Sequence, residues 1–162
     1  MTRRRSVALI LILVVDLGMV AWGLMAATWP DHLPGPHGAP ILTAGYEGFT
    51  KASWAELVAT SPMTAKYIGL LFRLYGVYCF VFGVVATAIA VTAFRRGDLW
   101  AWWTLLAGNT IALVSAMTYD WTVSAIGPFE LTEYLGVVAV YGALAITAPL
   151  RSPVPLVGQV PS

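Results

Sequence analysis

The stretch from Lys66 to Phe94, KYIGLLFRLYGVYCFVFGVVATAIAVTAF, decides the fold. It is apolar for longer than the roughly 20 residues that an α-helix needs to cross a bilayer, so it predicts a transmembrane helix. Glycines at positions 69, 76 and 83 stay on one helix face, because a helix drifts by only about 20° per heptad. Arg73 lies on that same face. We therefore expect this face to pack against other helices rather than against lipid.

The composition of the whole chain is that of an integral membrane protein. Its 162 residues are 59% hydrophobic and 10% charged, with a mean hydropathy of +0.77, whereas soluble domains carry about 25% charged residues. A net charge of +1, with basic residues grouped beside the apolar segments, argues against a nucleic-acid partner. Cys79 is the only cysteine, which excludes an internal disulfide or thiolate cluster and favours a buried, inert thiol.

Four apolar segments predict an all-α, four-helix membrane bundle within residues 1–148. The first segment is longer than the roughly 7 to 15 apolar residues of a signal peptide, so we expect it to be retained as an anchor. Beyond the last segment, the Pro-rich residues 149–162 predict a disordered cytoplasmic tail. The four spans are expected at about 6–27, 66–94, 99–118 and 129–147.

The connection at 28–65 is the only long polar loop. It opens with WPDHLPGPHGAP, whose four prolines and two glycines prevent a lasting helix or strand. Ser53 and Glu56 then match a capping box, which predicts a short interfacial helix with Trp54 at headgroup level. Ser61 and Pro62 predict the start of the second long helix.

Basic residues flanking the spans predict the orientation. Lys51 and Lys66 lie on one side of the membrane, against six arginines on the other. The positive-inside rule then places both termini in the cytoplasm, in a multi-pass protein that we expect in the bacterial inner membrane. The six arginines are Arg3, Arg4, Arg5, Arg95, Arg96 and Arg151.

Four polar residues inside the predicted spans form a candidate ligand-binding or intramembrane polar centre: Asp16, Arg73, Asn109 and Glu133. With a rise of about 1.5 Å per residue, Asp16 and Asn109 lie near the midplane and form an inner layer. Arg73 and Glu133 lie closer to the outer boundary and form an outer layer. An unpaired charge at such depth costs about 2.5 to 3.5 kcal/mol on insertion scales, so both layers predict pairing.

Each layer has a structural and a functional interpretation. In the outer layer, Arg73 forms an ion pair with Glu133, near Asp120 or Glu130, or it holds an anion or lipid headgroup. In the inner layer, the Asp16 carboxyl is protonated, hydrogen-bonded to Asn109 or reached by Arg73. Its functional readings are proton transfer, cation coordination or ligand anchoring. The structural readings are helix registry and assembly with a partner helix.

Other potential ligands carry little weight. His32 and His37 lie in the Pro/Gly loop without a third ligand at fixed spacing, so we interpret them as solvated loop residues. No span contains a histidine, which argues against axial haem ligation by this chain. No hydrolase, metalloprotease or nucleotide-binding motif occurs. We therefore predict no catalytic residue, no cofactor and no metal site.

The sequence Arg73-Leu-Tyr-Gly76, followed by the basic turn Arg95-Arg96-Gly97 and a tryptophan-rich third span, resembles small bacterial four-helix membrane proteins of the DoxX-like kind. Many members of that group have no known function. The resemblance covers residues 69–103. It implies a four-helix bundle, with a hint of association with redox or envelope systems.

Three hypotheses for the function follow. The leading one is a non-enzymatic accessory or assembly subunit of a membrane complex, whose partners are the lipid bilayer and other membrane subunits or a second copy. The alternative is a lipid- or small-molecule-binding protein or transporter, with a pocket over the four polar residues in the outer half of the bundle. The third is a membrane enzyme that uses Asp16 or Glu133 as an acid or base.

Overall fold

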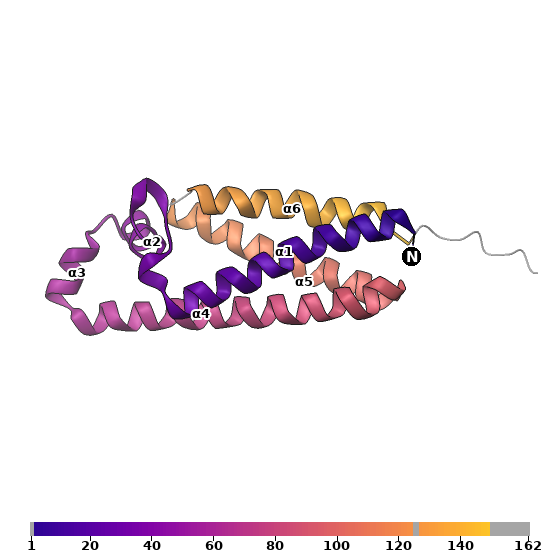
Figure 1. Ribbon diagram of the computed structural model, residues 1–162. Helices are drawn as coiled ribbons and strands as arrows, with labels where there is room; N and C mark the ends of the chain where they lie inside the picture. The colour runs from indigo at the N-terminus through magenta and orange to yellow at the C-terminus, as the bar shows by residue number, and fades with distance from the viewer. Residues whose placement is uncertain (1, 125–126, 150–162) are drawn as a thin grey trace, which may run out of the picture.

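The computed structural model describes residues 2–124 and 127–149, except for the side chains at 37 and 128–130. In these ranges the chain is helical and carries no β-strand, apart from one isolated bridge between Pro34 and Pro40. Four long helices lie side by side, and two short helices cap the end away from the N-terminus (Figure 1). The prediction of an all-α chain is therefore confirmed for the described residues.

The long helices are α1 (Arg3–Thr28), α4 (Pro62–Ile89), α5 (Leu99–Val123) and α6 (Pro128–Ile146). A π-helical segment, η3 (Ala90–Phe94), continues α4. By length and composition, α1, α4 with η3, and α5 are able to cross a membrane. In α6 the side chains at 128–130 lie outside the described residues, and the described part is apolar over Leu131–Ile146. Three of the four predicted spans thus correspond to helices of sufficient length. The membrane crossings themselves and the orientation stay predictions, and the predicted tail lies outside the described residues from 150 onward.

The loop between α1 and α4 is more structured than predicted. It contains the turns η1 (Pro30–His32) and η2 (Pro36–Gly38) and the helices α2 (Ile41–Thr50) and α3 (Trp54–Thr60). The sequence did not indicate α2, because its two glycines are poor helix formers and it is positioned by packing. An added Cβ at Gly45 of α2 would lie 2.9 Å from the Tyr119 hydroxyl of α5.

Helix α3 confirms the predicted short helix, whose interfacial position stays a prediction, but its predicted capping box is wrong. The Ser53 side chain makes no capping hydrogen bond. Instead, the backbone N–H of Trp54 donates to Oε1 of Glu47 in α2, at 2.9 Å. The Trp54 ring also packs edge-on against Tyr46. A side chain from the preceding helix thus satisfies the start of α3, and this contact joins the two short helices.

Helices α1 and α4 touch through their main chains along a seam of glycines. An added Cβ at Gly76 would lie 2.5 Å from the Ala27 nitrogen and 2.8 Å from the Gly23 oxygen. An added Cβ at Gly83 would lie 2.8 Å from the backbone carbonyl oxygen of Asp16. The predicted packing face is therefore confirmed at these two positions. It is wrong at Gly69, where an added Cβ meets nothing within 4 Å, because α1 ends before it reaches that turn.

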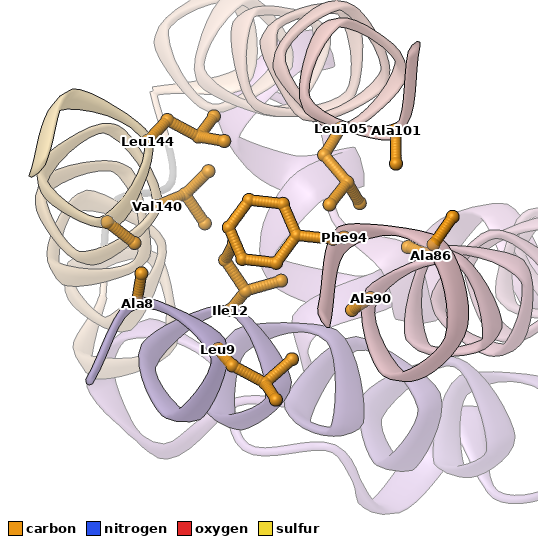
Figure 2. Close-up of a cluster of buried hydrophobic side chains, with 12 residues drawn as sticks. Ala8, Leu9, Ile12, Ala86, Ala90, Phe94, Ala101, Leu105, Val140 and Leu144 are labelled. Carbon is orange, nitrogen blue, oxygen red and sulfur yellow. The ribbon is translucent and has the colours of Figure 1, made fainter. Parts of the chain in front are cut away.

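A cluster of buried apolar side chains joins all four long helices near the end that holds the N-terminus. Figure 2 shows the Phe94 ring pointing into the middle of this cluster. Trp102 of α5 packs against it and donates from Nε1 to the Leu144 carbonyl of α6, at 3.0 Å. The cluster comprises Ala8, Leu9, Ile12, Ala86, Ala90, Ala93, Phe94, Ala101, Leu105, Val140, Ala143 and Leu144.

The outer faces of the long helices are apolar and exposed. Only 22% to 28% of the most apolar stretch of each candidate span is buried within the protein. Large aliphatic side chains point outward from every long helix, among them Val14, Leu70, Ile111 and Val138. A soluble monomer rarely exposes contiguous apolar patches of more than a few hundred Å². These faces are compatible with a membrane environment.

Candidate functional site

Asp16 is the buried polar residue that stands out in the structure. Its side chain is 1% exposed, and within the part of the chain that the structure describes, both carboxylate oxygens are buried without a hydrogen-bond partner. It lies on α1 where the glycine seam is tight, because the Asp16 main chain faces Gly83 of α4. Burying a polar group without a hydrogen bond is costly, and burying an ionised one costs far more. Asp16 is therefore a buried acid whose oxygens remain able to hold a proton or to contact a ligand.

Asn109 belongs to the same level of the protein as Asp16. Each follows a residue of the apolar cluster by four positions, Ile12 in α1 and Leu105 in α5, so each lies one helical turn beyond that cluster. Asn109 is 3% exposed. The prediction of a shared inner layer is thus supported by burial and position.

The predicted hydrogen bond between Asp16 and Asn109 is absent. Among the described residues, neither Asp16 oxygen accepts a hydrogen bond, and Nδ2 of Asn109 donates to the Leu105 carbonyl at 2.9 Å. The Asn109 amide thus donates within its own helix, to the carbonyl one turn back. The sequence placed the two residues at one depth, but depth does not determine which way each side chain turns.

Thr87 of α4 is a second buried polar group in this part of the seam, and the sequence analysis missed it. It follows Gly83 by four positions and shares its helix face. Its Oγ1 is buried and has no hydrogen-bond partner in residues 2–124 and 127–149. Other threonines donate to the carbonyl four residues back, for example Thr110 to Leu106 at 2.7 Å. The four-residue spacing from Gly83 was the signal that could have identified Thr87.

Arg73 does not form the predicted ion pair with Glu133. Its Nη1 donates to the carbonyl oxygens of Ala27 and Thr28, at 3.1 and 3.0 Å. These carbonyls lie at the end of α1, where the last carbonyl oxygens of a helix have no N–H of the same helix to accept from. A guanidinium there satisfies the exposed carbonyls and interacts favourably with the negative end of the helix dipole. Arg73 is therefore a capping residue that ties α4 to the end of α1.

Two acids that we assigned to the outer layer, Asp120 of α5 and Glu133 of α6, differ in burial. Asp120 is 6% exposed and Glu133 is half-buried. Asp120, which we predicted as a supporting residue near the surface, is therefore more buried in the protein than expected. The side chain of Glu130, the other predicted supporter, lies outside the described residues.

Neither of two hollows on the protein surface is lined by the four predicted site residues. One hollow, of about 260 Å³, lies at the end of α1 among Met25, Trp29, His32 and Leu33. The other, of about 280 Å³, lies at the opposite end of the protein beside Arg5 and Trp102. In the described chain, no three His, Cys, Asp or Glu side chains are grouped so that they could hold a metal ion.

No family model, curated protein or solved structure matches this chain. The resemblance to DoxX-like proteins therefore stays a prediction.

Proposed function

We propose that this chain is a multi-pass integral membrane protein whose four long helices form a transmembrane bundle. We further propose that it is a non-enzymatic accessory or assembly subunit of a membrane complex. The observation that carries the proposal is the apolar outer surface of the long helices. On α1, for example, Ile10 and Val14 are 61% and 66% exposed. Lipid or another subunit has to cover such a surface.

The exposed outer face of α6 (Pro128–Ile146) also favours assembly with another subunit over an isolated bundle. Leu135 and Val138 on α6 are 70% and 72% exposed. A neighbouring subunit on this face would cover both residues.

Native mass spectrometry of the protein, extracted gently from its own membrane, tests this proposal. We expect co-purifying subunits or a second copy. Leucine at Gly18, Gly69 or Gly142 tests three outer faces, because an added Cβ meets nothing within 4 Å at any of them. At least one variant should lose the partner, whereas the conservative Val138→Leu should keep it. If the wild-type protein carries no partner, and the three variants give the same spectra as the wild type, the proposal is overturned.

A second candidate function is the binding or transport of an ion or small molecule, and Asp16 favours it. An acid that is 1% exposed, with both oxygens unsatisfied, is suited to holding a proton or a cation. Thr87 and Asn109 supply further oxygen atoms at nearby levels of the helices. The same mass spectra test this candidate: a ligand retained by the wild type should be lost in Asp16→Asn. Retention of that ligand by Asp16→Asn would remove Asp16 from its site.

A further inference from the structure

The end of the protein that holds the N-terminus carries a positively charged hollow that neither proposal uses. Here α1 begins, η3 ends, α5 begins and α6 ends (Figure 1). The hollow has a volume of about 280 Å³. Arg5, Gly97 and Asp98 form its polar part, and Phe94, Trp102 and Pro149 belong to its apolar wall. Four segments that are distant in sequence thus meet around one cavity.

The charge around this hollow is strongly positive. Among the described residues, five arginines and one aspartate lie in its two flanking segments, a formal excess of four positive charges. The aspartate, Asp98, accepts from Nη2 of Arg96 at 2.9 Å, so its charge is already compensated. The ligand that suits this end of the protein is therefore an anion. The five arginines are Arg3, Arg4, Arg5, Arg95 and Arg96.

Arg5 is held in the wall of the hollow by the backbone of the turn between η3 and α5. Its Nη1 donates to the Arg96 carbonyl at 3.4 Å. Gly97 has φ +94°, and an added Cβ there would lie 2.6 to 2.8 Å from the guanidinium atoms of Arg5. The guanidinium therefore lies directly against Gly97 and needs a residue without a side chain. This is its one side-chain hydrogen bond to the described residues, so most of its five N–H donors are left for a ligand.

The start of α5 adds backbone donors to the same hollow. Asp98 is the N-cap residue of α5, but its side chain makes no capping hydrogen bond because it pairs with Arg96. The first N–H groups of a helix attract anions through their hydrogen bonds and the helix dipole. Leu99, the first residue of α5, lines the hollow. An oxyanion there would interact with both the Arg5 guanidinium and the start of the helix.

We propose that this hollow binds the phosphate group of an anionic phospholipid. Charge-assisted bonds from Arg5 hold the phosphate, and the apolar wall at Trp102 and Pro149 contacts the glycerol and the start of an acyl chain. The inference rests on the proposed function, because it places this end of the helices at a membrane surface. Clustered Lys and Arg beside a transmembrane helix attract anionic lipids electrostatically. A fixed guanidinium in a cavity adds directed hydrogen bonds to that attraction.

A lipid titration of the full-length protein in mild detergent, followed by native mass spectrometry, tests this site. We expect retained phosphatidylglycerol and no comparable retention of phosphatidylcholine with the same acyl chains. Arg5→Gln should weaken phosphatidylglycerol binding about tenfold or more, because it removes bonds from a charged donor. The control Arg3→Gln removes the same charge from an exposed residue outside the hollow. It should weaken binding about fivefold at most.

Two further arms of the experiment separate a built site from general attraction. Arg5→Lys keeps the charge but loses the planar fork, so it should weaken binding more than Arg3→Gln does. If Arg5→Lys binds as the wild type does, and Arg3→Gln equals Arg5→Gln, the inference is overturned. Displacement of the lipid by millimolar inorganic phosphate would also overturn it, in favour of a free anion. In each of these cases a protein that still fractionates with integral membrane proteins leaves the proposed function standing.

Discussion

Replacing Gly76 by alanine tests the tightest contact of the fold, the main-chain seam between α1 and α4. The new methyl group would lie 2.5 Å from the Ala27 nitrogen and 2.8 Å from the Gly23 oxygen, whereas ordinary contacts are 3.4 to 4 Å. The two helices must therefore separate by about 1 Å at this point. Main-chain atoms cannot rotate away as a flexible side chain would. The separation has to spread along the seam.

Two opposing contributions decide whether Gly76→Ala raises or lowers the free energy of unfolding. Overpacking a well-packed interior costs about 1 to 3 kcal/mol. Replacing glycine by alanine within a helix contributes about 1 kcal/mol in the stabilising direction. Because the clash in the seam is with backbone, we expect the upper part of the overpacking range. The free energy of unfolding should therefore fall by about 1 to 2 kcal/mol in Gly76→Ala.

Gly69→Ala is the matched control, since it makes the same chemical change on the same helix. An added Cβ at Gly69 meets nothing within 4 Å, so this variant should be neutral or more stable by up to about 1 kcal/mol. Unfolding of both variants in mixed detergent micelles, followed by circular dichroism, measures the difference. If the two variants shift the transition equally, the seam does not hold α1 against α4, and the reasoning fails.

Three other predictions follow from the described contacts. Asp16→Asn should raise the free energy of unfolding, because it replaces a buried acid, whose ionised form is costly to bury, by a neutral amide of nearly the same shape, and a lower melting temperature would contradict this. Arg73→Gln should lower that free energy by about 1 to 3 kcal/mol, since two carbonyls lose a charged donor, and hydrogen exchange should locate the loss at the end of α1. In a Cys79→Ser background, an impermeant thiol reagent added outside intact cells should label Ser53→Cys, but should label Arg96→Cys only after permeabilisation. The reverse pattern would invert the proposed orientation.

The long helices could be predicted because their signal is local. A run of apolar residues in the stretch from Lys66 onward fixes a helix without any knowledge of its neighbours. The heptad spacing also identified Gly76 and Gly83 as packing positions. The end of α1 was predicted to within a residue, but spacing alone did not show that this end lies beside Gly76, and this is why Gly69 proved to face no neighbour. A helical period identifies a face, but the partner's length decides how much of that face is covered.

Polar pairing and the outer loop depended on contacts that are distant in sequence. Depth arithmetic brought Arg73 to the level of Glu133, yet the unsatisfied carbonyls of α1 lie nearer and accept from its guanidinium. The same limit applies to α3, whose first N–H is satisfied by Glu47 of the preceding helix rather than by Ser53. In both cases the sequence indicated a polar group that needs a partner. Only the packed chain determines which partner it meets.

The position of Asp16 separates the two candidate functions. A partner subunit cannot reach a side chain that is 1% exposed without parting the helices around it. Opening the α1–α4 seam would break the backbone contacts at Gly76 and Gly83. Assembly must therefore use the outer apolar faces, where Gly18 and Gly142 lie open. It follows that Asp16→Asn should leave the subunit composition unchanged even where it abolishes ion or ligand binding, and that leucine at the outer glycines should have the opposite effect.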